Sequence, residues 1–157
     1  MISIKKDSII SYNTDMNPAD YLISVVTWQQ HEIALRTIRE QVFIREQAVP
    51  EALEWDGMDE NAIHILVRHS SGQAIATARL LNDGHIGRMA VLPDYRQQGV
   101  GSAMLRALLK VCQQHQLQAY LDAQTHALGF YQKMGFKTQG SEFMDAGIPH
   151  YRMILGE

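Results

Sequence analysis

A strand-like run that ends in a glycine-containing loop, directly before a long helical pattern, constrains the fold most. The run covers residues 85–92, and the loop RQQGVG follows at 96–101. From Val100 to about His115, apolar residues recur at the 3.6-residue spacing of a helix. The start of such a helix has unpaired backbone N–H groups and the positive end of the helix dipole. The segment therefore predicts an anion-binding loop. On this segment alone, the glycines have the alternative role of permitting a tight turn.

The rest of the chain predicts the element order β-α-β-β-β-α-β-α-β-β. A β-branched run at 21–28 predicts a strand, and helical spacing follows at 29–47. Three strands at 64–69, 73–81 and 85–92 are joined by turn sequences, which indicates an antiparallel meander. Thr125 is the expected N-cap of a helix that Gly135 closes. The remaining expected strands cover 118–123, 136–143 and 150–155.

Length and composition limit the class of protein. With 157 residues, 46% hydrophobic and 20% charged, the chain fits one folded domain at 21–157, preceded by an N-terminal arm at 1–20 with one short strand. The net charge of -3 argues against a nucleic-acid partner. No apolar segment is long enough to suggest a membrane partner. A single cysteine, Cys112, fits the core of a cytoplasmic protein.

Two common phosphate-binding motifs do not match the loop. GVGSAM has Met104 where the dinucleotide motif needs a small residue, and no G-K-[ST] follows for a nucleotide triphosphate loop. The segment VLPDYRQQGVGSAML instead resembles motif A of the GCN5-related N-acetyltransferase (GNAT) superfamily. ALGFYQKMGF, at 127–136, resembles motif B of that superfamily. VFIREQAVPEALEWDGMDENAIH, at 42–64, resembles the bacterial subgroup that includes ElaA-type proteins.

The GNAT resemblance implies an α/β (α+β) fold and a cofactor. The expected fold is a mixed, mainly antiparallel sheet of six to seven strands, splayed around its central strands and flanked by helices on both faces. The expected activity is transfer of an acetyl group from acetyl-CoA (coenzyme A) to a primary amine, by direct attack in a ternary complex. The resemblance assigns coenzyme binding to Met89, Ala90, Val91, Arg96, Gln97, Gln98, Gly99, Val100, Gly101, Ser102, Gln124 and Phe130.

The resemblance also implies a general acid, Tyr131, although a half-buried core tyrosine is the alternative. No glutamate stands on the strand before the loop, so no base carries over from the family. Glu46 and His64 are the preferred candidates because they flank the acidic loop, and a histidine titrates near neutral pH. Asp56, Glu60 and Asp122 are further candidates, and a water-mediated or base-free attack stays open. His126 and His150 are candidates for contact with the acceptor. No metal-ligand spacing stands out.

The acceptor and the partners are less constrained. An acidic run at 51–60 would attract a cationic amine, and its alternative is a solvated face. A non-catalytic acyl-CoA-binding sensor is the rival function, and a protein-interaction module that uses the N-terminal arm is a third. The oligomeric state is open, with a homodimer as one alternative.

Overall fold

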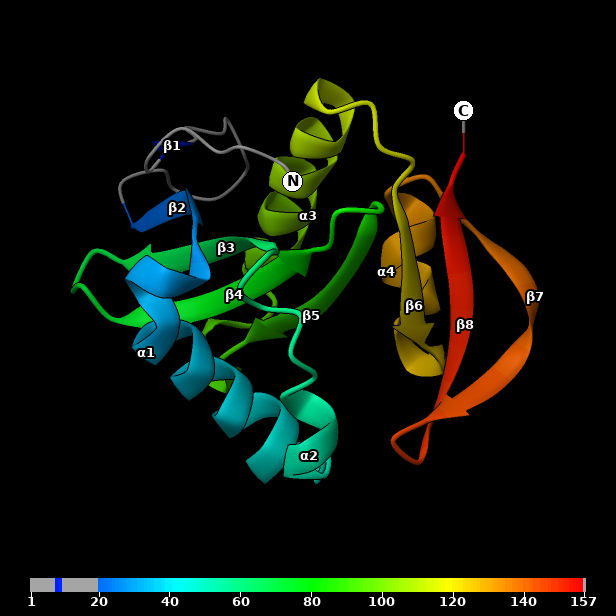
Figure 1. Ribbon diagram of the computed structural model, residues 1–157, viewed down its shortest axis with the longest axis horizontal. Coiled ribbons are helices and arrows are strands. Elements are labelled where there is room, and N and C mark those ends of the chain that lie inside the picture. Colours follow the sequence, from blue (N-terminus) through cyan, green and yellow to red (C-terminus); the bar gives the residue numbers. More distant parts are fainter. Residues whose placement is uncertain (1–7, 10–19, 157) are drawn as a thin grey trace.

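A computed structural model describes residues 8–9 and 20–156, which form one mixed sheet with helices packed against it (Figure 1). The strands are β1 (Ser8–Ile9), β2 (Tyr21–Val26), β3 (Ile63–His69), β4 (Ala74–Leu80), β5 (His85–Val91), β6 (Tyr120–Gln124), β7 (Phe136–Asp145) and β8 (Ile148–Leu155). The helices are α1 (Trp28–Arg39), α2 (Glu51–Glu54), α3 (Val100–Gln114) and α4 (Leu128–Lys133). The order in the sheet is β1-β2-β3-β4-β5-β6-β8-β7.

The sheet opens in its middle, between β5 and β6. All other neighbouring strands pair antiparallel, whereas β5 and β6 are parallel and share only the pairs His85 with Tyr120 and Ile86 with Leu121. Beyond these two pairs the strands separate, as Figure 1 shows. The splayed sheet that the family resemblance implied is therefore present.

Alternating side chains on the central strands place helices on opposite faces. On β3, Ile65 and Val67 belong to the core that includes the buried residues of α3. Leu66 points the other way and packs in the cluster that contains Leu35 and Ile38 of α1. Because successive strand residues face opposite sides of a sheet, α1 and α3 cover different faces. The prediction of helices on both faces is confirmed.

The predicted order of elements from residue 21 onward is confirmed, with local differences. The helix expected at 29–47 is α-helical only to Arg39 and continues as a π-helical segment, Glu40–Glu46. Thr125 does not cap a helix: it begins a 3-10 turn, Thr125–Ala127, and its hydroxyl donates to Glu142 Oε2 at 3.0 Å. Cys112 is buried in the core, as predicted.

The N-terminal arm is described only in part. Ser8–Ile9 forms β1 and pairs antiparallel with β2, so the sheet has eight strands where six to seven were expected. Of the arm predicted at 1–20, only these two residues and Asp20 fall within the described residues. No described helix is long and apolar enough to cross a membrane.

Candidate functional site

A cavity of about 760 Å³ lies where β5 and β6 separate. One wall is β5 from His85 to Val91, and the facing wall includes Asp122 and Gln124 of β6. The aromatic side chains of α4 line it as well, together with parts of the π-helical segment, of α2 and of the β7–β8 turn. The cavity therefore exists because two neighbouring strands stop pairing, and residues far apart in the sequence meet around it.

A β-bulge interrupts the wall formed by β5. Thr77 of β4 pairs with Ala90, and Arg79 pairs with Gly87, so two β5 residues oppose the single β4 residue between them. Arg88, the first of these two, has a φ of 48°, in the left-handed region. A bulge leaves its extra residue outside the ladder and redirects the strand. Backbone groups near Met89 are thereby turned out of regular pairing beside the cavity.

The glycine loop lies directly before α3, and its last two residues begin that helix. Gly99 has a φ of 81°, which glycine adopts without the strain that a Cβ would cause. The first helical bond runs from the Ala103 N–H to the Gly99 carbonyl, at 3.0 Å. Within the described part of the chain, the N–H groups of residues 97–102 have no backbone acceptor. These donors and the helix dipole suit an anionic group.

Arg96 of this loop is held by Glu46. Its two terminal nitrogens lie 2.8 and 2.7 Å from the Glu46 carboxylate oxygens, and its Nε donates to the Val91 carbonyl at 2.9 Å. The hydrogen bond from Arg96 lowers the pKa of Glu46. Glu46 thus reaches the cavity, as expected for a candidate base, but its carboxylate is committed to Arg96.

Tyr131 projects from α4 toward the β5 wall. Its hydroxyl lies 3.6 Å from Met89 Sδ, and its ring meets Phe130 and Phe136 edge-on. Burial raises the pKa of Tyr131 to about 12. The phenol therefore stays protonated at neutral pH and can donate a proton at this wall.

His64, the second preferred candidate base, is not part of the described cavity lining. The side chain is fully buried on β3, its Nε2 lies 2.9 Å from the Asp59 carbonyl, and its ring contacts Trp28 at a tilt of 37°. Burial lowers the pKa of His64 to about 4. Since the His64 side chain has no exposed surface, the structure leaves no path for an acceptor to the imidazole.

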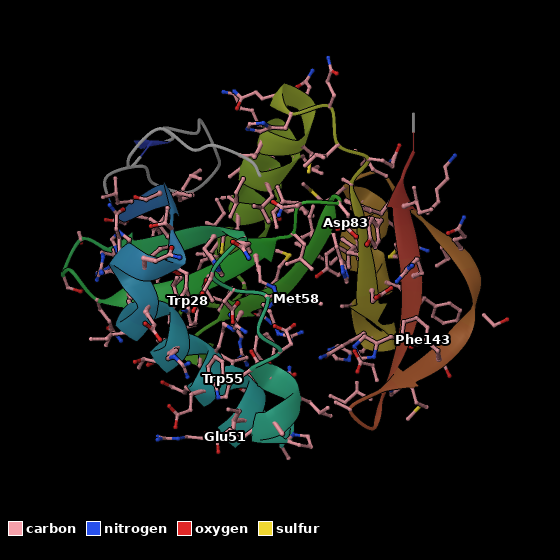
Figure 2. All side chains as sticks on the ribbon, in the orientation of Figure 1. Trp28, Glu51, Trp55, Met58, Asp83 and Phe143 are labelled. Carbon is pink, nitrogen blue, oxygen red and sulfur yellow. The ribbon has the colours of Figure 1, made fainter. Side chains whose placement is uncertain are left out.

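The acidic run is largely neutralised inside the protein. Three of its carboxylates form a network with three guanidinium groups from α1, β4 and β5: Glu54, Asp56, Asp59, Arg39, Arg79 and Arg88. Arg39 also lies over the Trp28 and Trp55 rings, which Figure 2 labels beside α1. Of the acidic run, only the exposed Glu51 and Glu60 lie outside this network, so the run attracts a cationic amine less than the sequence suggested.

Burial of Asp56 tends to raise its pKa, but the network lowers the pKa to about 2. Arg79 donates hydrogen bonds to the carboxylate, and the positive charges of Arg79 and Arg88 attract it. Sequence reasoning missed all three arginines. They stand singly in the chain, and no local pattern shows that α1, β4 and β5 bring them together.

The comparison with known families settles the class of the domain. Residues 24–156 match the family described as "Acetyltransferase (GNAT) domain". The chain belongs to the GNAT acetyltransferase family.

Relatives and solved structures agree with this GNAT assignment. The chain is 42% identical over 123 residues to the uncharacterized protein YyaT of Bacillus subtilis, covering 74% of this chain and 82% of YyaT. It is similar to the crystal structure of Escherichia coli ElaA, with 31% identity, a TM-score of 0.73 and coverage of 81% and 90%. An acyl-CoA N-acyltransferase from Pseudomonas aeruginosa matches with 28% identity, a TM-score of 0.74 and coverage of 87% and 99%.

Most of the site residues expected from the sequence line or adjoin this cavity. Its lining includes Glu46, Met89, Ala90, Val91, Arg96, Gln124, Phe130 and Tyr131. Gln97, Gln98, Gly99, Val100, Gly101 and Ser102 form the adjoining loop and the first turn of α3. Gln124 donates to the Gln47 side-chain oxygen at 3.0 Å, which links β6 to the end of the π-helical segment. His126 and His150 line the cavity, and so does His85, which sequence reasoning did not consider as a base.

Among the described residues, no three His, Cys, Asp or Glu side chains come together in a way that would hold a metal ion.

Proposed function

We propose that the protein transfers an acyl group, acetyl in the simplest case, from acyl-CoA to a primary amine. The observation that carries this proposal is the cavity between the separated strands, with the N–H donors of α3 at its edge and a protonated tyrosine at its wall. The GNAT family assignment and the similarity to an acyl-CoA N-acyltransferase support it.

The residues present suit coenzyme A. The unpaired N–H groups of residues 97–102 would hold the pyrophosphate, because they are donors at a helix N-terminus and Gly99 keeps a Cβ away from them. Backbone groups near the β5 bulge would pair with the pantetheine arm. Phe130 and Gln124 stand beside its route along the cavity. The coenzyme supplies a thioester, which activates the acyl carbonyl toward an amine.

The chain itself supplies the donors for this reaction. An N–H group of the β5 bulge would face the carbonyl oxygen, where negative charge develops during attack. Tyr131 would give its proton to the departing sulfur, which its position beside Met89 supports. The described lining contains no Cys, Ser, Thr or Lys, which supports direct attack by the amine in a ternary complex instead of an acyl-enzyme.

The acceptor is an amine with an uncharged nitrogen at the moment of attack. Its cationic form gains little from the acidic loop, since three carboxylates of that loop are paired with arginines. A cytoplasmic setting, where acyl-CoA is made, suits a chain whose single cysteine is a buried thiol.

A panel of amines with acetyl-CoA, followed by thiol release, tests the proposed function. We expect amine-dependent release by the wild type, and a loss of about 10²-fold in kcat for Tyr131→Phe with unchanged coenzyme affinity. Tyr151→Phe, a half-buried tyrosine outside the lining, is the matched control and should keep full activity. Tight coenzyme binding without turnover on any amine would instead support the sensor.

A further inference from the structure

His85 occupies the end of the cavity where β5 and β6 are still joined. It is the first residue of β5 and pairs with Tyr120 of β6. Asp122 is two residues further along β6, so its side chain is on the same face as that of Tyr120. His85 Nε2 lies 3.5 Å from Asp122 Oδ2, and both side chains line the cavity.

The imidazole and its carboxylate are both held in place. Arg152 of β8 donates to the two Asp122 oxygens from Nε at 2.9 Å and from Nη2 at 3.2 Å. The His85 ring stacks on Tyr120, with centroids 4.7 Å apart and planes at 12°. The Tyr120 hydroxyl in turn donates to Asp83, which Figure 2 labels at this end of the sheet. A carboxylate that orients one imidazole nitrogen fixes which nitrogen can accept a proton.

Charged groups from β4, β6, β8 and the β4–β5 turn face His85. Burial lowers its pKa below 6.5, the carboxylates Asp122 and Asp83 oppose this shift, and Arg152 and Arg79 add to it. The ring is therefore neutral at neutral pH. With Nε2 directed at Asp122, Nδ1 has no partner among the described residues and is free to accept a proton.

Each of the other candidate bases is either paired with an arginine or absent from the described cavity lining, and Glu60 is among those absent from it. Glu46 is paired with Arg96, Asp56 is paired with Arg79, and His64 is buried outside the cavity. Of the three imidazoles in the described lining, His85 alone lies within 4.0 Å of a carboxylate. His150 donates Nδ1–H to the Ile148 carbonyl on its own strand at 2.7 Å.

We propose that His85, oriented by Asp122, accepts the proton that the amine loses during attack. This inference rests on the proposed acyl transfer. The amine nitrogen forms a bond to the acyl carbon, and the carbon–sulfur bond breaks. One N–H proton passes to His85 Nδ1, and the Tyr131 proton passes to the sulfur, which leaves as the thiol. Solvent then returns a proton to Tyr131 and takes one from His85, so the enzyme is restored. His85 is a catalytic residue in this scheme, and Asp122 is a positioning residue.

The test compares the wild type with His85→Gln, Asp122→Asn and the control His115→Gln, an exposed histidine at the end of α3. We expect kcat/KM of His85→Gln to fall about 10²-fold, since general bases contribute 10²–10⁴-fold. Asp122→Asn should reduce it by a smaller factor. The control should behave as the wild type.

The pH profile provides a readout that a structural role would not produce. In the wild type, log kcat/KM should decrease with falling pH, and its slope should be steeper below the pKa of His85 than above it. Below that pKa the imidazole is already protonated and cannot accept the proton of the amine. The same midpoint should appear when the free protein is titrated and the His85 imidazole is followed by NMR. Asp122 raises the pKa of His85, so Asp122→Asn should move both midpoints to lower pH. His85→Gln should lose the steeper limb, and His85→Ala should recover activity with added imidazole.

The possible failures are distinguishable. If the wild type binds coenzyme A but turns over no amine, both the acyl-transfer function and this inference are wrong. If the wild type is active and His85→Gln keeps its rate and its acid limb, the inference alone is overturned. The His85 variants fail to fold if they lose coenzyme binding. In that case the two wild-type midpoints, from the kinetic pH profile and from the NMR titration of His85, are compared. Unequal midpoints would contradict a base at His85.

Discussion

Arg39 has no exposed surface, and two carboxylates compensate its charge. Its Nε lies 2.8 Å from Glu54 Oε1, and its Nη1 lies 2.5 Å from Asp59 Oδ1. Buried charges of this kind contribute little as intact pairs, because desolvation offsets their attraction. Removing one partner is different, since it leaves the other charge buried without compensation.

We predict that Arg39→Met lowers the free energy of unfolding by about 3–5 kcal/mol. The buried Glu54 and Asp59 carboxylates each lose their shorter ion pair and keep only the longer one, to Arg88 and Arg79 respectively. The matched control is Arg45→Met, which removes a solvent-exposed pair with Glu40 and should cost less than about 1 kcal/mol. Urea unfolding measures both. Equal effects of the two substitutions would contradict the structural role of the network.

The lowered pKa of Asp56 makes the free energy of unfolding depend on pH in the acidic range. Its pKa in the folded protein is about 2, below the ordinary aspartate value of 3.8, so the folded state favours the ionised carboxylate. The resulting stabilisation is complete above the unfolded pKa and is lost as the pH falls through 4 toward 2. Asp56→Asn should be less stable than the wild type at pH 7, and this difference should shrink toward pH 2. Urea midpoints at several pH values measure it, and a constant difference would refute the prediction.

Local residue patterns made some of these roles predictable and left others hidden. The glycine loop could be proposed as an anion site from the sequence, because its glycines and the start of a helix are adjacent there. The choice of Glu46 and His64 failed to anticipate an ion pair with Arg96 and complete burial on β3. The pair of His85 and Asp122 forms only when two strands meet, so neither residue carried a local indication.

At the scale of elements, the junction between β5 and β6 decides where the cavity begins. Gly84, directly before β5, accepts a hydrogen bond from the Tyr120 N–H at 3.1 Å. A Cβ at Gly84 would lie 2.1 Å from the Gln118 carbonyl oxygen. The close approach of these two backbone segments therefore requires glycine.

We predict that Gly84→Ala destabilises the protein by about 1–3 kcal/mol more than Gly72→Ala does, because only the first substitution creates a clash. Gly72 has a similar positive φ, 89° against 96°, and open space around its Cβ position. The shared backbone strain thus cancels in the comparison. Thermal unfolding measures both variants, and equal losses would show that the junction tolerates a Cβ.

The elements themselves differ in how far the sequence predicts them. The apolar spacing in α3 is regular over its whole length, and its predicted start at Val100 is confirmed. The change from α1 to a π-helical segment after Arg39 and the bulge at Arg88 have no comparable pattern. Arginine rarely adopts a positive φ, so tertiary contacts impose that conformation.

At the scale of the whole molecule, one topological event produces the site. A parallel pair of strands separates after two residue pairs, α1 and α3 cover opposite faces, and a cavity remains where the missing pairs would be. The element order and the family resemblance were enough to expect this arrangement. The contacts on which the proposed chemistry depends, such as that of Tyr131 with Met89, rely on packing between distant segments.

A crystal structure of the protein with coenzyme A tests the central claim most directly. We predict that the pyrophosphate accepts hydrogen bonds from the N–H groups of residues 97–102, and that the sulfur lies beside the Tyr131 hydroxyl, between β5 and β6. The position of the Arg96 side chain is a further check, because the guanidinium group can pair either with Glu46, as it does here, or with a phosphate of the coenzyme. Coenzyme bound outside the cavity, or with its sulfur remote from Tyr131, would contradict the account.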